Sequence, residues 1–256
     1  MRFIKIFIVW ILISQLGSLY GGDAFRWTVG EKLVYKVRWS FVRLGTLQMH
    51  LTDTVRVKGQ LLYKVDLKMD SNPVLIFVNL HNRYQCLIDS LFRPVKYVVK
   101  EKNGDQKNKM IYLFDYQKNT VIWQVFDPKD STKIIKQQLL KLDHYMYDGI
   151  SLTYFARGNA RENASFRVYS FFYARVGPVD MHFSAQPKNI YFKPLKRKFK
   201  TYQVQGMFHL KGIAGVTGAY KGWFTHDDRR IPLGAQMKVF VGNVKVELEH
   251  WEKWNP

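Results

Sequence analysis

Tyr147-Asp-Gly-Ile-Ser-Leu-Thr-Tyr-Phe-Ala-Arg157 is the one stretch of this 256-residue chain whose pattern favours a helix. Asp148 predicts where the helix begins, because its carboxylate can accept the unpaired backbone N–H groups of the first turn. From Ile150 onward no proline or glycine occurs before Gly158, which predicts the end of the helix. The chain is therefore expected to hold a single short helix near residues 148–157.

Apolar side chains would surround most of this helix. A helical projection places Leu152, Phe155 and Ala156 on one side, and Ile150 and Tyr154 on the other. A helix that is apolar around nearly its whole circumference is normally buried. We therefore expect it to pack against a sheet, either as a permanent core plug or as the wall of a ligand cavity. Leu152, Tyr154 and Phe155 are the candidates for lining such a cavity.

The rest of the chain has the alternation of half-buried strands. In residues 30–40, apolar side chains on one face alternate with basic side chains on the other: Leu33, Tyr35, Val37 and Trp39 against Lys32, Lys36 and Arg38. Similar segments, separated by turn-forming residues, predict further strands at 46–57, 61–69, 83–89, 94–101, 109–115, 120–126, 134–142, 165–176, 179–185, 188–200, 201–211, 219–225, 231–241 and 244–251. Residues 74–80 predict a short helical turn.

This spacing of strands, interrupted once by a helix, indicates a mainly β protein. We expect a large curved antiparallel sheet, in a half-barrel or barrel-like form, although a sandwich has the same pattern. Because no linker, low-complexity tract or repeat occurs, residues 23–256 are predicted to form a single domain.

The N-terminus has the layout of a secretory signal. Arg2 and Lys5 precede an apolar run over residues 6–13, and small and polar residues follow. We predict a signal peptide over residues 1–22, cleaved between Ser18 and Ala24; a retained anchor is the alternative. The protein is therefore expected in the periplasm or cell envelope, where it could associate peripherally with a membrane.

The chain is strongly basic, with a formal net charge of +20. This favours anionic partners such as a membrane surface. No nucleic-acid partner is expected, because export argues against one and the basic residues are spread along the whole chain. The densest basic run is Lys193-Pro-Leu-Lys-Arg-Lys-Phe-Lys200, which gives Lys193, Lys196, Arg197, Lys198 and Lys200 as candidates for contacting an anionic surface. The alternative is an edge strand protected from aggregation by its lysines and proline.

Nothing in the sequence identifies catalytic chemistry. Nucleophile-elbow, zinc-protease, P-loop and dinucleotide-binding motifs are all absent. The nearest pairings of histidine with carboxylates are Asp180 with His182, His144 with Asp148, and His226 with Asp227 and Asp228. They lack a third group at motif spacing, so we predict no catalytic residue, no metal ligand and no cofactor. The single cysteine, Cys86, cannot form an intramolecular disulfide and is expected to be a small buried apolar residue.

Three segments together resemble a known bacterial family. They are Gly30-Glu-Lys-Leu-Val-Tyr with Trp39 and Gly45; Tyr147-Asp-Gly-Ile-Ser with Arg157; and Trp223 followed by Ile231-Pro-Leu and Val241-Gly-Asn-Val-Lys-Val-Glu-Leu248. Their order and spacing are similar to the domain of unknown function 3108 family of exported bacterial proteins. The resemblance implies a mainly β envelope protein and supplies no catalytic residues. By analogy of fold, it also suggests the half-barrel carriers of periplasmic lipoproteins.

The leading hypothesis is a non-enzymatic envelope protein that binds an apolar or amphiphilic component, such as a lipid or an acylated protein. Two alternatives remain: an assembly or scaffold module that recognises a protein or polysaccharide, and a hydrolase of envelope polymers. The sequence predicts no oligomeric state.

Overall fold

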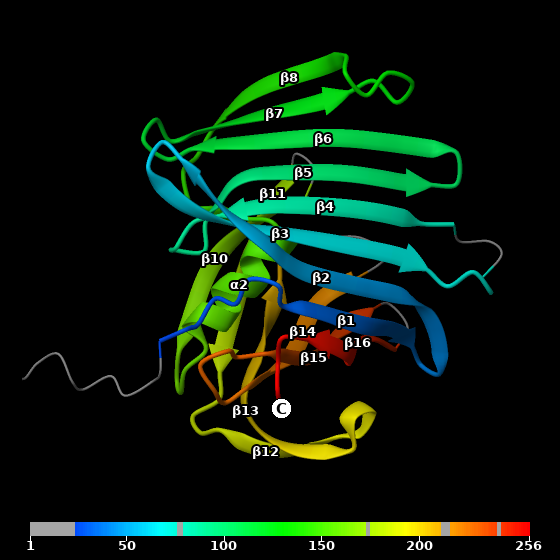
Figure 1. Cartoon of the computed structure of the whole chain (residues 1–256), viewed down its shortest axis with the longest axis vertical. Coiled ribbons are helices and arrows are strands. Elements are labelled where there is room, and N and C mark those ends of the chain that lie inside the picture. The colour runs from blue at the N-terminus through cyan, green and yellow to red at the C-terminus, as the bar shows by residue number, and fades with distance from the viewer. Residues whose placement is uncertain (1–23, 76–78, 173–174, 211–215, 240–241) are drawn as a thin grey trace, which may run out of the picture.

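In the part of the chain that the computed structural model describes, sixteen strands form a single continuous sheet that curves around a helix (Figure 1). The structure describes residues 24–75, 79–172, 175–210, 216–239 and 242–256. Its strands are β1 (Lys32–Trp39), β2 (Val42–Val57), β3 (Gln60–Ser71), β4 (His81–Ile88), β5 (Pro94–Asn103), β6 (Gln106–Asp115), β7 (Thr120–Phe126), β8 (Ile134–Lys141), β9 (Met146–Tyr147), β10 (Ser165–Phe172), β11 (Arg175–Phe183), β12 (Lys188–Phe192), β13 (Arg197–Phe208), β14 (Val216–Thr225), β15 (Pro232–Val239) and β16 (Asn243–Glu252). The helical elements among these residues are α2 (Gly149–Asn159) and the short 3-10 helix η1 (Lys193–Leu195).

The order of the strands explains the curved shape. It runs β8-β7-β6-β5-β4-β3-β2-β1-β16-β15-β14-β13-β11-β10-β9, with β12 attached only to β13. All the pairings are antiparallel except the one between β9 and β10. Because β1 pairs with β16, the two ends of the described chain meet in the middle of the sheet. The strands on the two sides of the β1–β16 pairing, β1–β8 and β9–β16, form two walls of the sheet. These walls bend towards each other, with α2 between them (Figure 1). The expected curved antiparallel sheet with one inserted helix is confirmed.

The start of the helix follows the prediction from Asp148. Its carboxylate accepts hydrogen bonds from the backbone N–H groups of Ile150 (2.8 Å) and Ser151 (3.2 Å). In return, the Asp148 N–H donates to the Ser151 hydroxyl at 3.0 Å, which completes a reciprocal capping box.

The end of the helix differs from the prediction. Gly158 lies within α2, which continues to Asn159. A glycine is needed there because a Cβ on Gly158 would lie 1.9 Å from the Phe92 ring. Close packing against this ring, and not a left-handed cap, accounts for Gly158.

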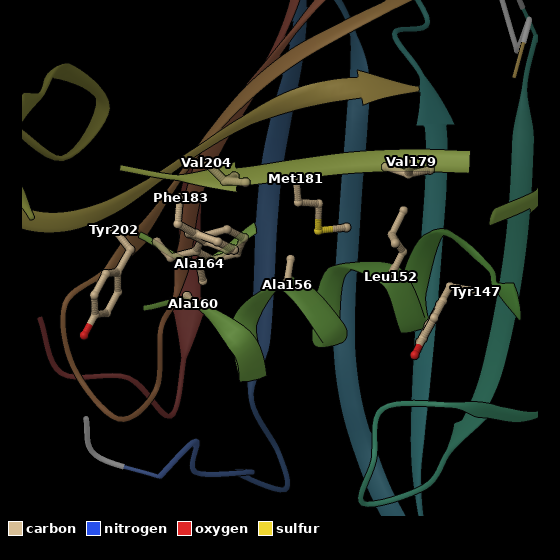
Figure 2. Close-up of a cluster of buried hydrophobic side chains, with 11 residues drawn as sticks. Tyr147, Leu152, Ala156, Ala160, Ala164, Val179, Met181, Phe183, Tyr202 and Val204 are labelled. Carbon is tan, nitrogen blue, oxygen red and sulfur yellow. The ribbon is translucent and has the colours of Figure 1, made fainter. Parts of the chain in front are cut away.

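Both sides of the helix are buried, as the apolar circumference predicted. Ile150 and Tyr154 belong to a cluster with side chains of β2, β3 and β4. Leu152 and Ala156 belong to a second cluster, with side chains of β11, β13 and β14 (Figure 2). The helix therefore lies between the two walls of the sheet and packs against both.

Several strand boundaries were wrong. The predicted strand 165–176 ends at Phe172, and β11 already begins at Arg175. The predicted strand 188–200 is interrupted by η1, where Pro194 supplies no N–H and Lys196 turns the chain with a φ of +48°. The strand that follows runs through residues 200 and 201 without a break.

Two other predictions fall partly or wholly outside the described residues. The helical turn expected at 74–80 includes residues 76–78, which are not described. The signal peptide expected at 1–22 lies wholly outside them. In the described part of the chain, no helix has the length and apolar character needed to cross a bilayer.

Candidate functional site

An apolar cavity of about 230 Å³ lies beside the helix. Its walls come from α2, from β1 and β2, and from strands of the β11–β16 wall. The lining residues are Tyr35, Leu47, Met49, Leu152, Thr153, Ala156, Met181, Val204, Phe208, Tyr220, Gly222, Phe224, Pro232, Gly234, Ala235, Met237 and Val246. Figure 2 shows Leu152 and Ala156 of the helix directed towards Met181 and its neighbours on the facing strands.

Small residues leave the space for this cavity. Ala156 is the shortest of the helix side chains that line the cavity, and Gly222 and Ala235 are directly paired across β14 and β15. The neighbouring Gly234 cannot be enlarged, because a Cβ there would lie 2.7 Å from the Val246 carbonyl oxygen. The cavity therefore arises where small residues from separate parts of the chain meet.

The three residues predicted to line a cavity occupy different places. Leu152 lines the apolar cavity. Tyr154 is outside its lining and stacks instead on Trp27, at 4.8 Å between ring centroids. Successive helix residues point in different directions around the axis, so Tyr154 belongs to the cluster on the opposite side.

Phe155 faces a second, more polar pocket of about 520 Å³. The lining residues of this pocket are Tyr116, Asn119, Leu142, Asp143, His144, Tyr145, Tyr147, Phe155, Arg167, Val168 and Tyr169. His144 stacks on Tyr169, with their ring centroids 3.9 Å apart. The Arg167 guanidinium is directed to Asp180, which accepts from its Nε at 2.6 Å.

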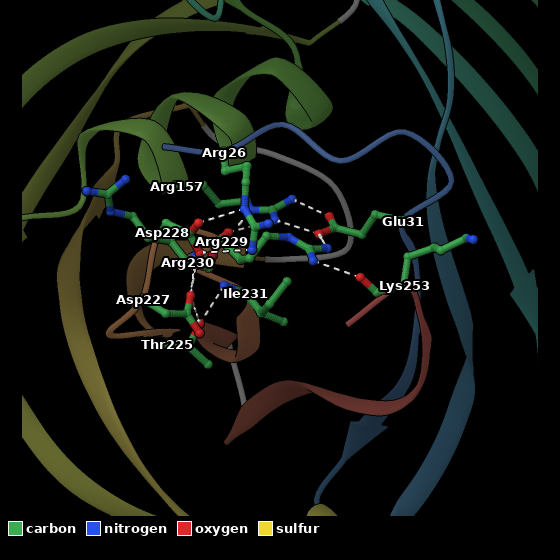
Figure 3. A network of polar contacts seen from close by, with 10 residues as sticks. All are labelled: Arg26, Glu31, Arg157, Thr225, Asp227, Asp228, Arg229, Arg230, Ile231 and Lys253. Atoms are coloured by element: carbon green, nitrogen blue, oxygen red, sulfur yellow. Dashed lines mark hydrogen bonds and ion pairs between the residues drawn. The ribbon is translucent and has the colours of Figure 1, made fainter. Parts of the chain in front are cut away.

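A buried ion cluster fixes the helix to the sheet (Figure 3). The Arg157 guanidinium donates to both carboxylate oxygens of Glu31, at 2.7 and 3.1 Å. It also donates to the carbonyl oxygens of Arg229 (2.9 Å) and Arg230 (3.2 Å). Arg157 and Glu31 are only 1% and 3% exposed.

The same cluster reaches the C-terminal segment. Arg229 donates one hydrogen bond to Glu31 and another, of 2.7 Å, to the Lys253 carbonyl oxygen. The cluster therefore ties together four segments: the residues before β1, the helix, the β14–β15 turn and the residues after β16. Arg157 belongs to the segments that carry the family resemblance, but the sequence did not predict its role in this cluster. An arginine on an otherwise apolar helix is the signal that a buried carboxylate partner is needed.

The electrostatics of the cluster favour the ionised carboxylate. Burial acts to raise the pKa of Glu31, but the charges and hydrogen bonds of Arg157 and Arg229 outweigh it. The pKa of Glu31 therefore lies below its ordinary value of 4.5. Glu31 thus contributes stability that is present above pH 4.5 and lost as the pH falls through its folded-state pKa.

This predicts a difference in acid sensitivity between the wild type and Glu31→Gln. Below pH 4.5 the urea midpoint of the wild type should fall more steeply, because both proteins protonate the other paired carboxylates but only the wild type also protonates Glu31. Urea denaturation at a series of pH values measures both curves. Parallel curves would contradict the role given to Glu31.

Cys86 is fully buried, as predicted. Its thiol donates to Asp148 Oδ2 at 3.1 Å. Burial, and then the nearby carboxylate, raises the pKa of the thiol well above its ordinary value. Burial likewise raises the pKa of Asp148. Cys86 is therefore expected to stay protonated. Its role is structural: from β4 it contacts Asp148, the residue that caps the start of α2.

The other histidine and carboxylate candidates have structural partners. Asp180 accepts hydrogen bonds from Arg167 and His209, and His182 is hydrogen-bonded to Ser165. Among the described residues, no three side chains of His, Cys, Asp or Glu lie close enough together to hold a metal ion.

The basic run lies on the hairpin of β12 and β13 and in the turn between them. Lys193, Lys196, Lys198 and Lys200 are exposed. Arg197 is exposed too, but its guanidinium donates a hydrogen bond to the Pro256 carbonyl oxygen.

Fold and site together define a barrel-like β protein built around a buried helix, with an apolar cavity beside that helix. The chain belongs to the DUF3108 family of proteins of unknown function, whose model matches residues 34–249. No curated protein matches the chain.

Comparison with solved structures finds one similar architecture and one weaker match, both at very low sequence identity. A β-barrel-like protein of domain of unknown function DUF1849 from Brucella abortus has a TM-score of 0.57 and 8% identity, covering 89% of this chain and 99% of its own. A predicted exported protein with a YmcC-like fold from Bacteroides fragilis has a TM-score of 0.35 and 6% identity, covering 91% and 100%. The first likeness supports the barrel-like fold, and the second is too weak to bear on it.

Proposed function

We propose that this protein binds the apolar part of an amphiphile from the cell envelope, such as a lipid or an acylated protein, in the cavity beside α2. One observation carries the proposal: a space of about 230 Å³, walled almost wholly by apolar side chains. A smaller apolar cavity, of about 150 Å³, engineered into another protein stays dry and binds benzene. A cavity of this size and lining is therefore suited to an acyl chain or a comparable apolar group.

Hydrophobic burial would supply the affinity. Each methylene group moved from water into an apolar site contributes about 0.8 kcal/mol. If a methylene group takes roughly the volume of a water molecule, about 30 Å³, the cavity holds on the order of eight of them. Such binding is strongly dependent on the length of the chain and weakly dependent on the chemistry of its head.

We further propose that binding, not catalysis, is the protein's role. The described residues that line the cavity include no carboxylate, imidazole or thiol that could transfer a proton or attack a substrate. A location outside the cytoplasm fits this role, and the signal-like N-terminus favours such a location.

A series of fatty acids from hexanoate to palmitate tests the proposal. We expect the dissociation constant to fall about fourfold for each added methylene group until the cavity is full, because 0.8 kcal/mol corresponds to that factor. Displacement of the fluorescent probe N-phenyl-1-naphthylamine measures each constant. The matching dicarboxylates are the control, since burying their second charged end is costly.

Chain-length-independent constants, or equal binding of the dicarboxylates, would contradict binding in an apolar cavity. A stoichiometric protein partner without any amphiphile would instead favour the assembly or scaffold hypothesis.

A further inference from the structure

The hairpin of β12 and β13 presents a cationic face with an exposed aromatic ring. Asn189 pairs with Lys200 and Tyr191 pairs with Lys198, so these four side chains share one face. Tyr191 is 57% exposed and both lysines are exposed. Lys193 and Lys196, in the turn between the strands, are exposed too. We call Tyr191, Lys193, Lys196, Lys198 and Lys200 the hairpin face.

The opposite face of the hairpin is anchored in the protein. Phe192 and Phe199 are buried in a cluster that includes Trp254. Arg197, on the same side by register, bonds to Pro256. One side of the hairpin therefore packs against the rest of the protein, and the other side is exposed to solvent. Figure 1 places it at the end of the molecule away from β8.

Acidic residues are missing from this part of the sequence. Residues 181–226 contain eight lysines and arginines and no aspartate or glutamate. Some basic side chains elsewhere on the surface do have acidic partners, for example Lys32 with Glu252 and Arg38 with Glu247. The positive charge of the hairpin face thus has no acidic neighbour in its own stretch of sequence.

We propose that the hairpin face docks on a membrane surface of anionic phospholipids. Lysines near such a surface are attracted to it, and the attraction decays within a Debye length of about 8 Å at physiological salt. Tyrosine is favoured at the membrane–water interface, because its ring is apolar and its hydroxyl is polar. The exposed ring of Tyr191 among four lysines fits that zone. This inference is independent of the apolar cavity.

Vesicle flotation tests the proposal with the full chain. The vesicles contain phosphatidylglycerol and phosphatidylethanolamine, with pure phosphatidylcholine vesicles as the uncharged reference. The hairpin variant carries Lys193→Gln, Lys196→Gln, Lys198→Gln and Lys200→Gln. The matched control carries Lys102→Gln, Lys107→Gln, Lys129→Gln and Lys133→Gln, four exposed lysines in the β5–β6 and β7–β8 regions. Both variants lose the same net charge.

We expect the hairpin variant to bind anionic vesicles on the order of 100-fold more weakly than the wild type, and the control to lose less than about threefold. The single substitution Tyr191→Ser should also weaken vesicle binding relative to the wild type. The difference should be larger at high salt, where the charges of the lysines are screened. Equal losses in both four-lysine variants would show attraction by net charge alone and overturn the proposal. Retained vesicle binding by the hairpin variant, with loss of binding to heparin, would overturn it in favour of an acidic polysaccharide.

Discussion

Glu31→Gln is expected to lower the free energy of unfolding by about 3–5 kcal/mol, because it leaves two buried arginines without their shared carboxylate. Arg157 and Arg229 both donate to Glu31 in the wild type. With a neutral amide in its place, these like charges remain buried, and some of their donors lose an acceptor. The effect should be large because breaking one side of a buried ion pair costs more than the pair itself contributes.

Urea denaturation at neutral pH measures this loss. Glu252→Gln is the control, since it removes a carboxylate from an exposed ion pair with Lys32. Exposed pairs contribute little, so this variant should unfold almost as the wild type does. A Glu31→Gln protein as stable as the Glu252→Gln protein would show that the buried cluster does not hold the helix in place.

The fold could be predicted from local patterns. Alternating apolar residues and turn formers placed most strands, and Asp148 correctly gave the start of α2. The errors arose where local pattern was weak. The two-residue strand β9 has no period to detect, and Gly158 was given the role of a cap because its contact with Phe92 is invisible in the sequence.

The candidate site was predictable only in part. That the helix is buried followed from its composition, and Leu152 does line a cavity. The cavity itself depends on Ala156, Gly222 and Ala235 coming together, and no local pattern brings them together. The partner of Arg157 lies 126 residues away in the chain. Contacts of this range follow from the topology of the sheet, which pairs the first strand with the last.

Ala156→Leu is the second change with a large expected effect. The added carbons project into the cavity, because Ala156 is one of its lining residues. We expect loss of probe and fatty-acid binding, while the free energy of unfolding stays within about 2 kcal/mol of the wild type, since cavity filling stabilises and overpacking destabilises by such amounts.

Leu152→Ala is the matched opposite, because it enlarges the same cavity. It should lower the free energy of unfolding by about 2–5 kcal/mol and keep the binding of acyl chains. The pair of variants thus separates loss of space from loss of stability. Equal binding by Ala156→Leu and the wild type would place the ligand elsewhere.

Native mass spectrometry of the protein, purified from its own cells as wild type and as Ala156→Leu, tests the central claim most directly. We expect one amphiphile bound per wild-type chain, identified in the organic extract, and none bound to Ala156→Leu. The same amphiphile on both proteins, or an empty wild-type chain, would contradict binding in the cavity beside α2.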